Sequence, residues 1–300
     1  MLPAWVTRRM IFRVFAILAA IVAYVLQPHR HLSTSAVGYV KQGQWALVLG
    51  GSHGLGEAWA HQLAALKLNL ILVARQAKPM ETLKEALLSK VDIEIETWTQ
   101  DLANLTETWL LETLERHQVR LLVVNAAFSG PRGSFLDGGL GESKTVIDVN
   151  ILAMLTSAHL FGNHLSQQGA AGGMVLMSSV AGEIGGAFIA NYAASKAYIT
   201  TFAQGLNIEL TGTGIDVMAC LAGPTLTPTY LGAAKEAARN TYLEQEPYEV
   251  VSECLANLGR NSWVVTGPLN KLVHLVFTRL LPRSLALQVV SDQTGKLLGL

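Results

Sequence analysis

The sequence predicts a single α/β domain built on a doubly wound parallel sheet, with a helical extension at its C-terminal end. Short runs rich in Val, Ile and Leu alternate with longer segments of helical periodicity, which is the pattern of a parallel sheet with helices on both faces. The chain has 300 residues, 50% apolar and 15% charged, which is enough to bury one large core. Strands are expected near residues 45–49, 69–73, 93–98, 120–124, 173–178, 215–220 and 262–265.

A glycine-rich turn follows the first of these strands. It has the spacing Gly-x3-Gly-x-Gly and leads into a segment of helical character that ends near Lys67. Backbone N–H groups at the start of a helix bind phosphate, and side chains in place of the glycines would hold a pyrophosphate away or separate helix from strand. A tight turn alone would also use glycine. The pattern predicts a dinucleotide phosphate site formed by Gly50, Ser52, His53, Gly54, Leu55 and Gly56.

Tyr192 and Lys196 are four residues apart in a segment of helical character, so they share one face of the helix. An ammonium group beside a phenol stabilises the phenolate and lowers the pKa of the phenol from about 10. Tyr192 could then exchange a proton with a substrate alcohol or carbonyl. This spacing also arises by chance, and Ser179 earlier in the chain gives it weight.

These motifs resemble those of the short-chain dehydrogenase/reductase family over residues 45–223. Ser179 precedes Tyr192 at the family's spacing, and Asn150 stands where the family has the Asn of its catalytic tetrad. The resemblance implies a Rossmann-like fold and an NAD(P)-dependent enzyme that acts on CH–OH groups. It implies that Ser179 binds the substrate oxygen and Tyr192 transfers the proton. Lys196 would lower the pKa of Tyr192 and hold the nicotinamide ribose, while Asn150 would orient a water that relays protons to Lys196.

The same resemblance assigns further cofactor contacts, although several nearby positions depart from the family pattern. Leu49 stands for the usual Thr before the turn, Val124 and Ala127 replace an Asn and a Gly after the fourth strand, and Ala222 replaces a Pro. None of these groups donates a proton, so we expect altered rigidity or cofactor affinity and not loss of chemistry. The implied cofactor contacts are Asp101, Leu102, Asn125, Ala126, Gly223 and Thr227, together with Tyr192 and Lys196.

The end of the second strand bears on the choice of cofactor. An acid there would grip the ribose hydroxyls of NAD and repel a 2′-phosphate, but the chain has Arg75, whose planar charged fork suits phosphate. His53 occupies a turn position that is often basic in NADP-preferring members of the family. The plainer interpretations are a solvated arginine and a surface histidine. NADP(H) is therefore predicted, with NAD(H) the alternative.

Composition and cysteine usage exclude other classes of function. The formal net charge is zero and there is no basic block, so nucleic acid is not an expected partner. Cys220 and Cys254 are the only cysteines, with no CxxC and no His/Cys metal spacing. Both are interpreted as reduced core residues, and no metal is predicted.

The first 43 residues form a separate segment ahead of a catalytic domain over 44–300. The uninterrupted apolar run from Val14 to Leu26 is a marginal membrane span, flanked by Arg8, Arg9 and Arg13. A membrane anchor, a cleaved secretory signal and an amphipathic or packing helix all remain open. We expect a membrane-associated protein whose catalytic domain is cytosolic, or a cytoplasmic protein if the segment is not an anchor.

Two later segments bear on substrate and assembly. Residues 224–246 lack a strand and are the expected substrate lid, and residues 269–283 predict a helix packed on the core, on a second subunit or on a membrane surface. A lipophilic ketone, sterol-like alcohol, retinoid-like aldehyde or acyl derivative would suit an anchored enzyme. The alternative function is a non-catalytic NADP(H)-binding sensor or scaffold. The family resemblance implies a homodimer or homotetramer formed by the long helices on either side of the fifth strand.

Overall fold

The computed structural model describes residues 16, 19, 22–23, 31–131 and 133–300. The predicted N-terminal anchor lies almost entirely outside the described residues.

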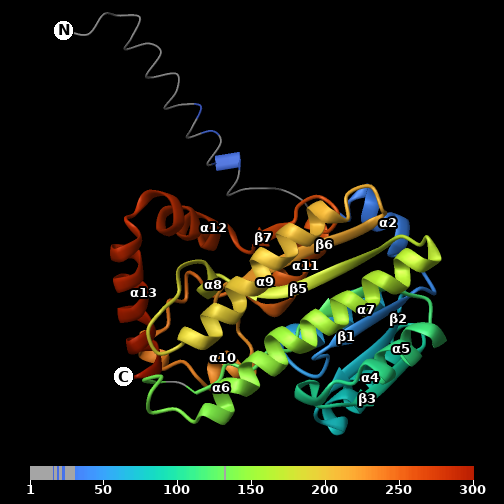
Figure 1. Cartoon of the computed structure of the whole chain (residues 1–300), viewed down its shortest axis with the longest axis horizontal. Coiled ribbons are helices and arrows are strands. Elements are labelled where there is room, and N and C mark those ends of the chain that lie inside the picture. The colour runs from blue at the N-terminus through green and yellow to red at the C-terminus, as the bar shows by residue number, and fades with distance from the viewer. Residues whose placement is uncertain (1–15, 17–18, 20–21, 24–30, 132) are drawn as a thin grey trace, which may run out of the picture.

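A seven-stranded parallel sheet forms the centre of the fold (Figure 1). Its strand order is β3-β2-β1-β4-β5-β6-β7, so the chain starts in the middle, builds one half of the sheet and then returns to build the other. This order is that of a doubly wound fold, and every predicted strand is present. The strands are β1 (Trp45–Leu49), β2 (Asn69–Ala74), β3 (Ile95–Thr99), β4 (Val119–Val124), β5 (Gly172–Ser179), β6 (Ile215–Ala222) and β7 (Trp263–Val265).

Helices cover both faces of this sheet, because successive strand residues point to opposite sides. Ala46 and Val48 of β1 join a core cluster with α2, α3, α4 and α11, whereas Leu47 and Leu49 join a second cluster with α5, α7 and α9. These helices are α2 (Thr34–Tyr39), α3 (Leu55–Ala65), α4 (Ala77–Leu88), α5 (Glu107–Arg116), α7 (Ala153–Gln168), α9 (Ala190–Glu209) and α11 (Pro247–Asn257).

Shorter helical elements lie between the long ones and beyond them. The 3-10 helices are η1 (Leu102–Asn104) and η3 (Glu236–Ala238), and the π-helical turns are η2 (Asp148–Leu152) and η4 (Val276–Leu280). The remaining α-helices are α6 (Leu140–Ile147), α8 (Ala181–Ile184), α10 (Pro228–Leu231), α12 (Pro268–Leu275) and α13 (Arg283–Leu298).

The C-terminal extension consists of α12, η4 and α13, and it confirms the predicted helical extension. Pro282 ends the first helical stretch and serves as the N-cap of α13. The helix predicted over residues 269–283 therefore ends before Pro282, and α13 is a second helix. The extension packs against the segment that follows β5: the Ser291 hydroxyl accepts a hydrogen bond from the Ala187 amide at 3.0 Å, and Phe188 lies against Gly295. Figure 1 shows α13 running along one end of the domain.

The prediction that both cysteines are reduced is wrong. Cys220 of β6 and Cys254 of α11 are fully buried and paired as a disulfide, with their Cα atoms 5.9 Å apart. They are separated by 34 positions in the sequence, and only the packing of α11 on the sheet brings them together. No group of His, Cys, Asp or Glu side chains in the described part of the chain could hold a metal ion.

Among the described residues, one helical run, Leu140–Gln168, is long and apolar enough to cross a membrane. It comprises α6, η2 and α7, and the side chains of Met154 and Phe161 within it are fully buried against the sheet. This run is therefore a core helix of the domain.

Candidate active site

The glycine turn is held in place by the ends of two neighbouring strands. The amides of Gly50 and Gly51 donate to the Val73 carbonyl of β2 at 2.7 and 3.1 Å. On the other side, the Asn125 side chain donates to the Gly50 carbonyl at 2.9 Å. Asn125 thus stabilises the turn, which is a structural role in addition to the cofactor contact predicted for it.

At two positions of the turn, a side chain larger than that of glycine would overlap neighbouring backbone atoms. Gly50 has a φ of +89°, and a Cβ there would lie 2.6 Å from the Ala126 amide nitrogen. Because Gly50 has no side chain, the turn can lie close to the chain after β4. The sequence predicts a different reason for this glycine, namely room for a pyrophosphate. A Cβ on Gly56 would overlap the Gly50 carbonyl oxygen. This agrees with the prediction that a side chain at Gly56 would separate helix from strand.

The turn leads directly into α3, whose first residue is Leu55 and whose N-cap is Gly54. No side chain caps this helix, so the N-terminal end keeps its capacity for an anionic ligand. The Ser52 hydroxyl lies 3.0 Å from His53 Nδ1, and the His53 side chain is exposed. The cradle of small residues at an uncapped helix start fits a dinucleotide pyrophosphate.

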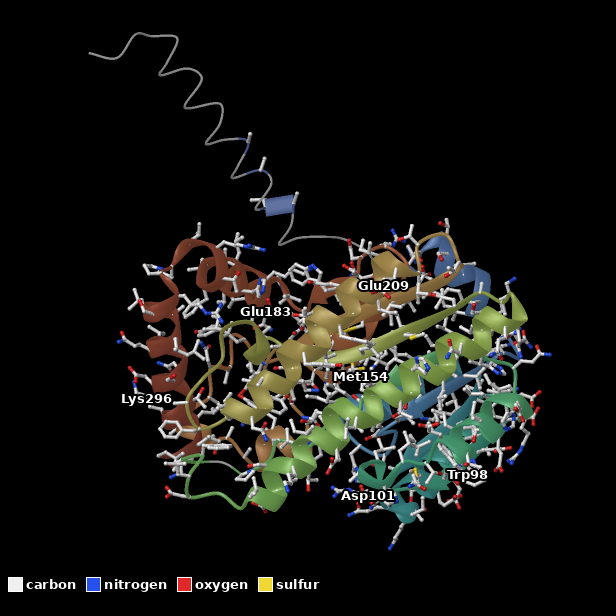
Figure 2. The ribbon with its side chains drawn as sticks, viewed as in Figure 1. Trp98, Asp101, Met154, Glu183, Glu209 and Lys296 are labelled. Carbon is white, nitrogen blue, oxygen red and sulfur yellow. A yellow bond between two sulfur atoms is a disulfide. The ribbon has the colours of Figure 1, made fainter. Side chains whose placement is uncertain are left out.

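The residues predicted to select the cofactor lie at the carboxyl ends of β2 and β3. Arg75 follows β2, is exposed, and forms no ion pair with any described residue. Asp101 follows β3 and accepts a hydrogen bond from the Ala103 amide at 3.1 Å, so it caps η1 (Figure 2). The Leu102 side chain is buried in the core, which leaves its main chain as the part that could meet a base.

The remaining predicted contacts follow β4 and β6. The Ala126 amide donates to the Leu49 carbonyl at 2.7 Å, which ties the end of β4 to the start of the turn. Gly223 follows β6, and a Cβ there would lie 2.7 Å from Asn270 Cγ of α12. Thr227 is the N-cap of α10, and its methyl group would lie 2.8 Å from a Cβ on Gly54. The structure therefore brings Thr227 and the glycine turn together.

Ser179, Tyr192 and Lys196 meet beyond the end of β5. Tyr192 lies in the first turn of α9, one turn before Lys196, and the Lys196 ammonium lies 5.7 Å from the centroid of the Tyr192 ring. Lys196 is buried and donates to the Met177 carbonyl at 2.7 Å. Burial lowers the pKa of Lys196 to about 8.

Tyr192 differs from the expectation in its acidity. Burial raises its pKa above the usual value, and a hydrogen bond from Ser179 acts in the opposite direction. The expected lowering of this pKa is therefore wrong as a net effect, because the loss of hydration outweighs the contacts that stabilise the phenolate.

Asn150 lies in the π-helical turn η2 and is buried. Its side-chain oxygen accepts from the Phe128 amide at 2.7 Å, and its nitrogen donates to the Phe128 carbonyl at 3.0 Å and to the Ser195 hydroxyl at 2.9 Å. The Ser195 hydroxyl in turn donates to the Tyr192 carbonyl at 2.7 Å. Asn150 therefore connects the loop after β4 to the helix turn that carries Tyr192.

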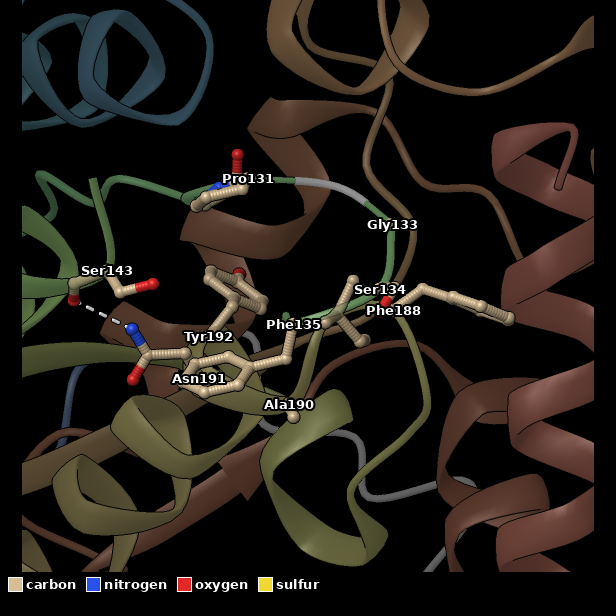
Figure 3. Close-up of a pocket in the computed structure, with 11 residues that line it drawn as sticks. Pro131, Gly133, Ser134, Phe135, Ser143, Phe188, Ala190, Asn191 and Tyr192 are labelled. Carbon is tan, nitrogen blue, oxygen red and sulfur yellow. Dashed lines mark hydrogen bonds between the residues drawn. The ribbon is translucent and has the colours of Figure 1, made fainter. Parts of the chain in front are cut away.

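A small cavity of about 30 Å³ opens beside Tyr192 (Figure 3). Pro131 and Phe135 come from the loop after β4, and Phe188 comes from the segment before α9. The Asn191 side chain donates to the Ser143 carbonyl at 2.7 Å and so connects α9 to α6. In this arrangement the cavity holds about one water molecule.

Residues 224–246 close over the carboxyl edge near β6. Their two ends meet where Thr225 pairs with Gln245 in an isolated bridge. Within the segment, Arg239 Nε and Nη2 donate to the two Glu244 carboxylate oxygens at 2.6 and 2.8 Å, and the Tyr230 hydroxyl donates to the same carboxylate at 3.0 Å. These contacts give the segment a fixed internal structure.

Sequence reasoning missed several residues of this site. Ser195 lies within the Tyr-x3-Lys motif, and its place between two motif residues could have suggested a supporting role. Phe188 has a φ of +69°, which is uncommon for a residue with a side chain, and it lines the cavity. No local sequence signal marks Phe188, because its position depends on contact with α13.

The fold and this site define an α/β oxidoreductase with a dinucleotide site at the carboxyl edge of its sheet. The family model for short chain dehydrogenases matches residues 44–237, and the chain belongs to that family. It is therefore an NAD(P)-dependent dehydrogenase/reductase that acts on CH–OH groups. The matched part includes the glycine turn, Asn150, Ser179, Tyr192 and Lys196.

Known proteins of related sequence and structure agree with this membership. A 7beta-hydroxysteroid dehydrogenase from Clostridium sardiniense is 28% identical over 231 residues, which is 77% of this chain and 88% of that protein. A very-long-chain 3-oxoacyl-CoA reductase from Aspergillus clavatus is 31% identical over 73% of this chain and 63% of that protein. A short-chain dehydrogenase from Sphingobium yanoikuyae, solved in complex with NADPH, has a TM-score of 0.68 and 26% identity and covers 75% of this chain and 87% of that one.

Proposed function

We propose that this protein is an NADP(H)-dependent carbonyl reductase or alcohol dehydrogenase that acts on a lipophilic substrate. The observation that carries the proposal is the meeting of Ser179, Tyr192 and Lys196 beside a cavity, next to a glycine turn that fits a pyrophosphate. A bound nicotinamide dinucleotide supplies the hydride in reduction and accepts it in oxidation. We further propose that residues 44–300 form the catalytic domain and that residues 224–246 are its lid.

In the reductive direction, each side chain has one role in handling the substrate oxygen. The Ser179 hydroxyl donates a hydrogen bond to the carbonyl oxygen, and Tyr192 donates the proton that turns the developing alkoxide into an alcohol. The raised pKa of Tyr192 keeps it protonated and ready to donate. The Lys196 ammonium stabilises the phenolate that remains after proton transfer.

Asn150 enters the proposal as a positioning residue. Both of its side-chain N–H groups are already used, on Phe128 and Ser195. A water relay to Lys196 of the kind that the family resemblance implies would therefore use the main chain of Asn150. Its side chain keeps η2, the loop after β4 and the start of α9 in register.

NADP(H) is favoured by the charge at the end of β2. Arg75 offers an exposed guanidinium without an acidic partner among the described residues, and the S. yanoikuyae structure of related sequence contains NADPH. A guanidinium fork binds a 2′-phosphate through charge-assisted hydrogen bonds.

Changing Arg75 to Ala should weaken NADPH binding at least about tenfold, as expected for loss of one charge-assisted contact, and should leave NADH binding within about twofold. Cofactor fluorescence titration measures both dissociation constants. Lys78→Ala, which removes an exposed cation in the first turn of α4, is the matched control. Equal weakening of both cofactors by Arg75→Ala would argue against a phosphate contact.

The lipophilic substrate is inferred from the relatives and the cavity. The related proteins are named for hydroxysteroids and very-long-chain 3-oxoacyl-CoA, and Phe135, Phe188 and Pro131 line the space beside Tyr192. The cavity is smaller than either kind of molecule, so the loop after β4 and the segment before α9, which line it, must open for binding. A panel of ketosteroids and 3-oxoacyl thioesters with NADPH tests the proposal. Tight NADPH binding without oxidation on any of them would favour the sensor function.

The pH profile of carbonyl reduction should reflect Lys196. We expect kcat/KM to be level below about pH 8 and to fall about tenfold per pH unit above it, because the neutral amine no longer stabilises the phenolate.

The free energy of unfolding should change with pH in the opposite direction. The unfolded chain binds the proton up to about pH 10.5, so between about pH 8 and 10.5 the contribution of this group to stability increases with pH. Initial rates and thermal unfolding over pH 6–10 measure both, and a level rate up to pH 9.5 would contradict the role of Lys196.

Membrane association and assembly complete the proposal. The apolar run Val14–Leu26 would attach the protein to a membrane as a shallow or re-entrant anchor, with the catalytic domain in the cytosol. Leu152, at the N-cap of α7, and Tyr198 and Ile208 of α9 are 50%, 38% and 72% exposed, a surface suited to a homodimer or homotetramer.

A further inference from the structure

The helix α12 buries its polar residues. Asn270, Lys271 and His274 are 6%, 2% and 9% exposed. The Lys271 ammonium pairs with the Glu253 carboxylate of α11, and His274 Nε2 lies 3.2 Å from the Glu183 carboxylate of α8. Because buried charged groups need partners, these contacts fix which side of α12 faces the domain.

The opposite side of α12 and η4 is apolar and faces outward. Leu269, Leu272 and Leu280 are 40%, 38% and 66% exposed, and with Val276 they recur every three or four residues, so they form one line along the helix. We call these four residues the outer stripe. A surface helix of a water-soluble domain normally has the reverse arrangement, with its apolar stripe inward. The outer stripe is therefore a surface that requires a partner.

The charge around the outer stripe has one sign. Residues 268–291 contain no Asp or Glu, although the whole chain has as many acids as bases. Arg279 is exposed next to the stripe, and Arg283 follows at the start of α13, where it is exposed and its Nη2 lies 3.5 Å from the Ile184 carbonyl. Apolar side chains flanked by bases suit the boundary between acyl chains and anionic headgroups.

The position of the outer stripe also fits a lipid surface. Arg260 Nη2, in the connection between α11 and β7, donates to the carbonyls of His31 and Leu32 at 3.2 and 3.1 Å. His31, where the described domain begins, therefore lies near the start of β7, the edge strand that leads into α12. The chain that precedes His31 contains the apolar run Val14–Leu26. The described domain thus begins at the sheet edge that also carries α12.

We propose that the outer stripe of α12 and η4 rests on an anionic lipid bilayer, where its leucines enter the headgroup boundary and Arg279 and Arg283 contact the headgroups. The buried ion pairs of Lys271 and His274 hold the helix in this orientation. The contact places the C-terminal end of the domain on the membrane, whichever substrate the enzyme reduces.

A fluorescent probe on the outer stripe tests this contact in the full-length protein. Leu280→Cys is labelled with an environment-sensitive fluorophore, and Ser89→Cys, exposed beside β3 at the opposite edge of the sheet, is the control site. The native cysteines are buried and paired, so they do not compete for the label. With anionic vesicles that contain brominated lipid, we expect at least twofold quenching at position 280 and none at position 89. Neutral vesicles should give less quenching.

A charged substitution provides the second comparison. Leu272→Glu should remove the quenching at position 280, whereas Leu88→Glu, at a similarly exposed leucine of α4, should leave it unchanged. NADPH binding by each variant shows that the domain is folded. Vesicle binding without quenching at position 280 would overturn the proposal, because the protein would then be attached by its N-terminal segment alone. A vesicle-independent blue shift would also overturn it. A shift that grows with protein concentration would mean that a second copy of the protein covers the outer stripe. A shift independent of protein concentration would mean that the chain's own N-terminal segment covers it.

Discussion

Replacing Tyr192 by Phe should lower kcat for carbonyl reduction by about 10²–10⁴-fold and leave the dissociation constant of NADPH within about twofold. The substitution removes only the hydroxyl, which we propose donates the proton to the substrate oxygen. The ring that fills the space beside Lys196 remains, so the packing of α9 on β5 is retained. Single-turnover oxidation of bound NADPH by an active ketone measures the chemical step, and fluorescence titration measures cofactor binding.

Tyr198→Phe is the matched control for this prediction. Tyr198 lies on the same helix, is 38% exposed and stacks on Phe202 with a centroid distance of 6.0 Å. Removing its hydroxyl should leave turnover unchanged. If Tyr192→Phe retained more than about a tenth of the wild-type rate, another group would have to supply the proton, and the proposed role of Tyr192 would be wrong.

The sheet could be predicted from the sequence because its signals are local. Most of the strands are short runs of apolar residues, and those of β1 and β2 are buried along their whole length; the edge strand β3, which contains Glu96 and Thr97, is the exception. A run buried on both faces belongs to a parallel sheet with helices on each side, and the chemistry then falls at the carboxyl edge. The glycine turn, Ser179 and Gly223 could be placed at that edge before any coordinates.

Features that depend on long-range packing could not be predicted in this way. The disulfide between Cys220 and Cys254 depends on the position of α11 against β6, and the contact between Phe188 and α13 joins distant segments. The orientation of α12 is another example. Its sequence alternates apolar and polar residues at helical spacing, and only the acids Glu183 and Glu253 on neighbouring helices show that the polar side is the buried one.

The spacing of Tyr192 and Lys196 predicts that they share a helix face, but it does not predict the pKa of Tyr192. The spacing placed Lys196 on the correct helix face, but the direction of the pKa shift of the phenol is set mainly by its loss of hydration. The lowered pKa of Lys196 and the raised pKa of Tyr192 have the same cause, which is the loss of hydration in the core. Both shifts favour the uncharged form of each group.

Changing Gly56 to Ala should destabilise the domain by about 1–3 kcal/mol and weaken NADPH binding more than about tenfold. The backbone of Gly56 has no positive φ, so the added methyl group acts only through its overlap with the Gly50 carbonyl oxygen. That oxygen also accepts the hydrogen bond from Asn125. Helix α3 must therefore move away from β1, and the phosphate cradle loses its shape together with its brace.

Gly205→Ala separates this steric effect from the general effect of replacing a helical glycine. Gly205 lies in α9, and a Cβ there meets no atom within 4 Å. The change should stabilise the domain by about 0.5–1 kcal/mol and leave NADPH binding unchanged, because alanine loses less backbone freedom on folding. Thermal unfolding with and without NADPH measures both effects. If Gly56→Ala behaved like Gly205→Ala, the contact between α3 and the glycine turn would be loose enough to relax, and the fit of the turn to a pyrophosphate would lose its main structural support.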